Sequence, residues 1–171
     1  VYAAARVAQI MLYAGVKDVR ILDGGWKAWS DAGLPVERGT PAKVTPAPDF
    51  GAPIPGQPQL MVDMDQARGM LHRQDASLVS IRSWPEFIGE TSGYSYIKPK
   101  GEIAGARWGH AGSDATHMED FHNPDGTMRS ADDIAAQWKR WNILPEQHVA
   151  FYCGTGWRAS ETFMYARAMG W

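Results

Sequence analysis

The chain contains a single cysteine, Cys153, whose neighbours favour reactivity over simple burial. A mostly apolar run, 148–152, precedes it, Gly154 and Gly156 follow, and a helix-like stretch begins after Arg158. Because glycines leave backbone N–H groups unobstructed and a helix start is partially positive, this setting stabilises a thiolate. An ordinary buried cysteine is the alternative, since free cysteine is often found in cores. We prefer a nucleophile at the carboxyl end of a buried strand, where open α/β sheets bind ligands.

The loop that begins at Cys153 has a size suited to a small anion. Its sequence, Cys-Gly-Thr-Gly-Trp-Arg, predicts a ring of amides around the sulfur, and we expect the guanidinium of Arg158 to close one side. A persulfide carries its negative sulfur about one bond beyond the cysteine sulfur, where such amides stabilise charge. The residues that we expect to bind substrate are Gly154, Thr155, Gly156, Trp157 and Arg158. The corresponding loop of cysteine-dependent phosphatases is longer, so a phosphatase is a less favoured alternative.

Several separate segments together resemble the rhodanese family of sulfurtransferases. Beside the cysteine loop, the segments that carry the resemblance are 78–82, 85–87, 101–106, 23–26, Trp29 and 33–35. The resemblance implies an α/β fold, a rhodanese-like open parallel sheet with helices on both faces. It also implies that Cys153 takes sulfane sulfur from thiosulfate or 3-mercaptopyruvate, holds it as a persulfide and passes it on. The expected partners are a small anionic sulfur donor and a thiol, cyanide or protein acceptor, and no cofactor is expected.

Because the chain departs from the family pattern at several positions, the sequence does not decide which sulfur donor it uses. Relatives that use mercaptopyruvate tend to have smaller residues where this chain has Trp157 and Arg158. The indole of Trp157 could narrow the sulfur pocket, stack on a protein acceptor or pack under the loop. Arg82 and Glu86 are expected to support the site as a structural ion pair at the sheet edge, with ordinary surface charges as the alternative. A non-catalytic module for docking or sulfur relay is a further alternative, which the intact Cys153 disfavours.

The first residues of the chain are similar to the helix that follows the cysteine loop. Sliding the chain along itself so that Gly15 meets Gly170 also aligns apolar residues 7–14 with 162–169. We therefore predict parts of two repeats. The predicted segments are 1–38 as the C-terminal tail of a preceding rhodanese domain, 39–59 as a Pro-rich linker, and 60–171 as a catalytic rhodanese domain without its last strand and helix. Remaining segments of a parent chain would complete both domains; alternatively, the first segment fills the open strand position itself.

Turn and capping signals divide the chain into short elements. Asp63 with Gln66 and Ser130 with Asp133 have the pattern of helix N-caps. The predicted helices are 2–14, 25–32, 65–73 and a stretch from Ser130 to about Trp141, and the predicted strands are 19–22, 78–81, 106–108 and 148–152. This order, with helical and strand-like segments alternating, favours a parallel sheet.

Composition indicates a folded domain and gives no sign of a nucleic acid or membrane partner. The 171 residues are 44% hydrophobic and 21% charged, with a formal net charge of -2. Local amides and arginines must therefore hold an anionic substrate, because no global field attracts it. No apolar run approaches the ~20 residues of a membrane span. One cysteine excludes an internal disulfide but does not fix the compartment, so a bacterial protein of either periplasm or cytoplasm fits.

Histidines in the polar stretch 111–127 and beside it are not expected to bind a metal. His110, His117 and His122 have acidic neighbours, but their spacing matches no helical face and no ligand motif. We interpret them as solvated residues.

Overall fold

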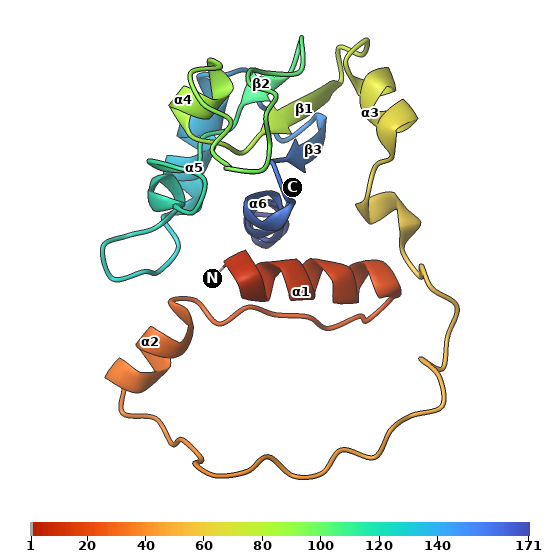
Figure 1. Cartoon of the computed structure of the whole chain (residues 1–171), viewed down its shortest axis with the longest axis vertical. Helices are drawn as coiled ribbons and strands as arrows, with labels where there is room; N and C mark the ends of the chain where they lie inside the picture. The colour runs from red at the N-terminus through yellow and green to blue at the C-terminus, as the bar shows by residue number, and fades with distance from the viewer. Residues whose placement is uncertain (1) are drawn as a thin grey trace.

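The computed structural model describes residues 2–171 and shows a parallel sheet flanked by helices (Figure 1). The elements in chain order are α1 (Tyr2–Ala14), α2 (Gly25–Asp31), the 3-10 helix η1 (Pro58–Leu60), α3 (Met64–Met70), β1 (Ala76–Ser80), α4 (Trp84–Phe87), β2 (Arg107–Trp108), the 3-10 helix η2 (Glu119–Phe121), α5 (Ala131–Lys139), β3 (His148–Tyr152) and α6 (Trp157–Ala168). The strand order is β2-β1-β3 with parallel pairing throughout. The expected open parallel α/β sheet is confirmed.

The central strand β1 fixes where the functional loops meet. Every residue of β1 is buried, so neither face of this strand is open to solvent. Ser80 is in register with Trp108 of β2 and with Tyr152 of β3, which brings the carboxyl ends of the strands to one edge. Arg82 follows β1 and Cys153 follows β3 at this edge. Parallel α/β sheets place their ligand sites at such an edge.

A hydrophobic core between the sheet, α5 and α6 holds the cysteine strand in place. Val79 of β1, Trp138 of α5 and Tyr165 of α6 belong to one buried cluster, and Phe151 of β3 packs against it. The indole N–H of Trp138, which is fully buried, donates to the carbonyl of Gly109 at 3.1 Å. Because α6 is anchored in this core, the loop that joins β3 to α6 has both of its ends fixed.

The first helix packs directly on α6 (Figure 1). Ala5, Ala8 and Leu12 of α1 form a second buried cluster with Met164 of α6. Their spacing places them on one helix face, and the alanines allow the two helices to approach closely. The chain returns to α1 after the extended stretch that follows α2, where Gln57 donates to the carbonyl of Leu12 at 3.2 Å. The first segment is therefore attached to the second through helix packing.

The strand predicted over 19–22 does not form. This segment has no strand partner within residues 2–171, and Val19 and Ile21 pack beside the α1 cluster instead. A strand needs the free edge of a neighbouring strand, and α1 and α6 lie between this segment and the sheet (Figure 1). The alternative in which the first segment fills the open strand position of the second repeat is therefore wrong.

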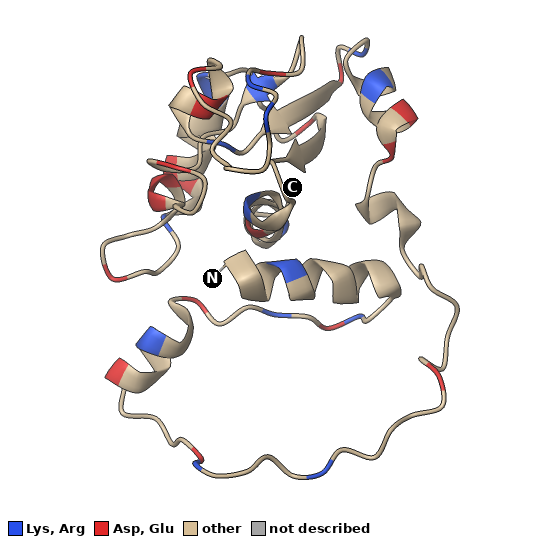
Figure 2. Cartoon of the chain, in the orientation of Figure 1, with Lys and Arg blue, Asp and Glu red and all other residues tan. Residues whose placement is uncertain are grey.

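Local capping signals were more reliable than strand signals. Asp63 accepts from the Gln66 amide and Gln66 accepts from the Asp63 amide, both at 2.8 Å, so the predicted capping box of α3 is confirmed. Ser130 accepts from the Asp133 amide at 3.1 Å at the start of α5. The helix ends differ from expectation: α3 ends at Met70 and α5 at Lys139, in each case earlier than predicted. Charged residues of both signs are distributed over the elements (Figure 2).

Candidate active site

Cys153 lies at the end of β3 with its sulfur directed toward the start of α6. Its side chain is partly exposed, and the Gly156 N–H donates to its Sγ at 3.1 Å. Gly156 is the N-cap of α6 and has a φ of 85°, a left-handed conformation that favours glycine. The thiol is therefore neither sealed in the core nor turned away from the loop amides. A backbone donor and the positive end of the α6 helix dipole both face its sulfur.

Gly154, the other glycine of the loop, lies against the ring of Tyr94. A Cβ placed on Gly154 would lie 2.3 Å from the Tyr94 ring, so only glycine fits beneath this aromatic side chain. Tyr94 belongs to the loop that follows α4, and its backbone N–H donates to the Ser92 hydroxyl at 3.3 Å. Nothing local in the sequence of this loop indicates that it folds onto a segment so distant in the chain.

Arg158 forms a buried ion pair with Glu86 beneath the loop. Its Nη1 and Nη2 each donate to a carboxylate oxygen of Glu86 at 2.8 Å, and both side chains are fully buried. The same guanidinium donates to the carbonyl of Asp114 at 3.2 Å and to the Tyr94 hydroxyl at 3.3 Å. Ser83 holds Glu86 from the other side, since its N–H and Oγ both donate to Oε2, at 2.9 and 2.8 Å. The pair thus ties α4 to the first turn of α6.

Each member of the pair keeps the other charged. Burial acts to raise the pKa of Glu86, but the hydrogen bonds and charge of Arg158, with the donors of Ser83, hold it below its ordinary value. Burial likewise acts to lower the pKa of Arg158, and the hydrogen bonds and charge of Glu86 outweigh it and raise that pKa. Bidentate geometry of this kind is what a buried ion pair needs to offset the loss of water.

The ion-pair partners of Arg82 and Arg158 differ from those expected from the sequence. We expected Arg82 to pair with Glu86, but Arg82 binds Glu102 at 2.7 Å and the Gly101 carbonyl at 2.8 Å. We also expected Arg158 to close one side of the anion ring, but both of its Nη atoms are engaged by Glu86. The positions of the elements explain this difference. Glu86 in α4 lies against the first turn of α6, whereas Arg82, just after β1, lies against the 101–102 segment. A cation at a helix start does have an anionic partner, as its unfavourable position implied.

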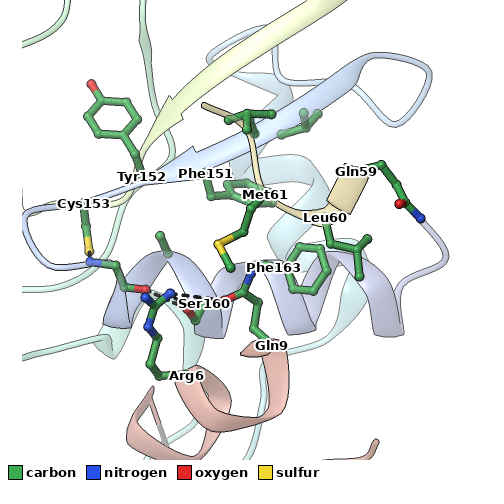
Figure 3. A pocket seen from close by; sticks show the side chains of 15 residues that line it. Arg6, Gln9, Gln59, Leu60, Met61, Phe151, Tyr152, Cys153, Ser160 and Phe163 are labelled. Atoms are coloured by element: carbon green, nitrogen blue, oxygen red, sulfur yellow. Dashed lines mark hydrogen bonds between the residues drawn. The ribbon is translucent and has the colours of Figure 1, made fainter. Parts of the chain in front are cut away.

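A cavity of about 390 Å³ opens beside Cys153 (Figure 3). Its walls come from β3, from α6, from the 59–62 segment and from α1, which contributes Arg6 and Gln9. Of the site residues expected from the sequence, Cys153 and Gly156 line this cavity. Sequence reasoning missed Arg6 and Gln9, although the internal repeat had already indicated a helix over 2–14. The repeat gives no information on which helix that segment faces.

Trp157 lies at the first position of α6 and points away from the core. It is 44% exposed and makes an edge-to-face contact with Tyr2, with ring centroids 6.0 Å apart. It therefore does not pack under the loop, and its indole is available near the junction of α1 and α6.

The histidines bind different acidic partners. His117 pairs with Asp114 at 2.7 Å, and His110 lies 3.5 Å from Asp120. His122 contacts buried Glu161 at 2.6 Å. Within residues 2–171, no group of three or more His, Cys, Asp or Glu side chains is arranged to hold a metal ion.

The longest helix of the described part, α1, has 13 residues, and no helix there meets the requirements of a bilayer span.

Comparison with known proteins decides the family. The family described as Rhodanese-like domain matches residues 63–171, which include the Cys153 loop, Glu86 and the whole sheet. The chain belongs to the rhodanese-like domain family. Thiosulfate sulfurtransferase YnjE of Escherichia coli (strain K12) is 88% identical over the full chain, which covers 39% of that protein. The crystal structure of YnjE superposes with a TM-score of 0.96 over 100% of this chain and 41% of the other.

Two further solved structures that are similar to the chain hold small molecules. A structure of EanB with a cysteine persulfide and ergothioneine is 50% identical, with a TM-score of 0.94 over 99% of this chain and 40% of EanB. The anaerobic ergothioneine biosynthesis enzyme from Chlorobium limicola, in complex with trimethyl histidine, is 49% identical with the same TM-score and coverage. This rhodanese-like chain thus spans about two fifths of the length of these relatives.

Proposed function

We propose that the chain carries the active site of a sulfurtransferase that moves sulfane sulfur through a persulfide on Cys153. The observation that supports it most directly is the Sγ of Cys153, which accepts from the Gly156 N–H at the head of α6 and lines an accessible cavity. The name of YnjE and the cysteine persulfide of EanB agree with this chemistry in relatives. Thiosulfate is the preferred donor, with 3-mercaptopyruvate as the second.

The first half-reaction with thiosulfate is a displacement at sulfur. The thiolate of Cys153 attacks the outer sulfur, a new S–S bond forms, and the S–S bond of thiosulfate breaks with its electron pair leaving on sulfite. The Gly156 N–H and the start of α6 then stabilise the anionic persulfide. In the second half-reaction an acceptor attacks the terminal sulfur and releases the Cys153 thiolate. Cyanide, a small thiol and a protein thiol are acceptors of suitable chemistry.

The remaining loop residues have supporting roles in this proposal. Arg158, Glu86 and Arg82 act as positioning residues, because their side chains are engaged in ion pairs. Gly154 and Thr155 complete the backbone ring around the sulfur, and exposed Trp157 contacts the acceptor. We further propose that 1–38 is the tail of a preceding rhodanese repeat, joined through 39–59 to the catalytic domain of 60–171, which the packing of α1 on α6 supports.

Mass spectrometry of the protein after incubation with thiosulfate tests the proposal. We expect a gain of about 32 Da on Cys153, the mass of one sulfur atom, that cyanide or a thiol reductant removes. Trimethyl histidine is a third acceptor to include, because the Chlorobium limicola enzyme binds it. The matched control is Cys153→Ser, which must not gain the mass. A wild-type protein that stays unmodified with both thiosulfate and 3-mercaptopyruvate would instead indicate a docking module, and Cys153-dependent hydrolysis of an aryl phosphate would indicate a phosphatase.

A further inference from the structure

The face of helix α1 that packs on α6 carries two polar side chains, Arg6 and Gln9, beside its buried apolar residues Ala5, Ala8 and Leu12. Arg6 is the only charged residue of this helix (Figure 2), and it faces α6 together with Gln9, which is 5% exposed. On the outer face, Val7 is 58% exposed and Ile10 43%. Burying polar groups costs free energy unless they are hydrogen-bonded, so a helix that served only to pack on α6 would carry apolar residues at these two positions as well. Arg6 and Gln9, unlike the apolar residues of this face, line the cavity beside Cys153, which points to a further role for them.

The guanidinium of Arg6 adjoins the residue that donates to the cysteine sulfur. A Cβ placed on Gly156 would lie 3.4 Å from Nη1 of Arg6. The same Nη1 donates to Gln9 Oε1 at 3.1 Å and lies 3.5 Å from Ser160 Oγ, whose hydroxyl donates to the Gly156 carbonyl at 2.7 Å. Figure 3 shows this group at the cavity wall, below the loop of Cys153. Gln9 and Ser160 thus hold Arg6 in place with neutral groups.

The charge of Arg6 is not neutralised by any side chain of the described part of the chain. No carboxylate lies within 4.0 Å of it in residues 2–171, whereas Arg158 pairs with Glu86 and Arg82 with Glu102. A cation in a partly enclosed cavity attracts anions more strongly than one on an open surface, because less water screens it. Cys153 opens onto the same cavity.

We propose that Arg6 binds the oxyanion end of the sulfur donor, so that the first segment of the chain completes the active site of the rhodanese domain. This inference rests on the proposed sulfur transfer. A guanidinium can donate two parallel hydrogen bonds to the oxygens of a sulfonate or a carboxylate. With thiosulfate, Arg6 binds the sulfonate oxygens before the S–S bond breaks and keeps them bound in the sulfite that leaves with the electron pair of that bond. Arg6 is therefore a substrate-binding residue contributed from outside residues 63–171.

Steady-state kinetics of Arg6→Gln test the proposal. We expect the KM for thiosulfate to rise about ten-fold or more, since a charge-assisted hydrogen bond is lost, with a smaller change in kcat. Arg6→Lys should recover part of the loss because it keeps the charge. The matched control is Arg20→Gln, which removes an exposed arginine of the same segment that pairs only with Asp18. Comparing thiosulfate with 3-mercaptopyruvate tells whether Arg6 binds sulfonate, carboxylate or both.

A binding experiment separates this inference from the proposed function. In the Cys153→Ser background, calorimetry with sulfite and with thiosulfate measures anion binding without turnover. Loss of binding on adding Arg6→Gln supports the inference even if the protein transfers no sulfur. Equal binding in the two proteins, or a lowered kcat and melting temperature with unchanged KM, overturns it and leaves Arg6 with a packing role. Failure of the wild-type protein to form a persulfide would reject the sulfur transfer alone.

Discussion

Arg158 and Arg6 both lie beside the cysteine loop, and they differ in the groups that bind their guanidinium. Arg158 is 2% exposed and has a carboxylate on both of its Nη atoms. Arg6 is partly exposed at a cavity, and its side-chain partners within residues 2–171 are an amide and a hydroxyl. A guanidinium whose charge is cancelled inside the protein contributes rigidity, whereas one held by neutral groups retains its charge for a ligand. The comparison therefore assigns loop positioning to the buried arginine and anion binding to the open one.

Removing the carboxylate below the loop should have the largest effect on stability. Glu86→Ala leaves Arg158 buried without its partner, which we expect to lower the free energy of unfolding by about 3–5 kcal/mol. Denaturant unfolding monitored by tryptophan fluorescence measures this change.

The double variant Glu86→Leu with Arg158→Met is the informative control. It removes both charges and keeps apolar volume, so it should be more stable than Glu86→Ala. Arg6→Gln should change stability far less than Glu86→Ala. If Glu86→Ala unfolds at the same denaturant concentration as the wild-type protein, the buried pair does not hold the loop and the contrast between the two arginines fails.

The variant Gly154→Ala, which adds a methyl group to the loop, should disturb the protein less than Glu86→Ala does. The new Cβ would lie 2.3 Å from the Tyr94 ring, so the ring must move and its contact with Arg158 is disturbed. Overpacking of this kind typically costs about 1–3 kcal/mol, and we expect slower persulfide formation as well. Gly69→Ala in α3 is the matched control, because a methyl group there meets nothing within 4 Å. Equal rates of sulfur uptake in the two variants would mean that Tyr94 does not shape the loop.

The features found from sequence are those that depend on adjacent residues. The run before Cys153, the glycines after it and the cap at Asp63 all act within a few positions, so the strand, the loop and the start of α3 were predictable. The Arg158 pair with Glu86 joins residues 72 apart, and the Arg6 contact with Ser160 joins residues 154 apart. No local pattern encodes which helix α1 meets. The strand expected over 19–22 was wrong for the same reason, because its apolar residues required a partner that sequence could not assign.

The smallest effect that we predict is a loss of stability at acid pH, where protonation of Glu86 weakens its ion pair with Arg158. Arg6 pairs with no carboxylate in the described part of the chain and should not contribute to this loss. The pKa of Glu86 is lower in the folded protein than its ordinary value of 4.5, so its ion pair contributes fully above that value. Stability is lost as pH falls through the folded pKa, because the folded protein must then take up a proton that the unfolded chain already holds. Arg158 adds no dependence here, since its pKa is raised. Unfolding free energies of wild type and Glu86→Gln, measured between about pH 7 and pH 3, should differ by a constant amount down to about pH 5 and then converge. A difference that stays constant into the acid range would show that folding does not lower the pKa of Glu86, and hence that its pairing with Arg158 does not stabilise the charged carboxylate.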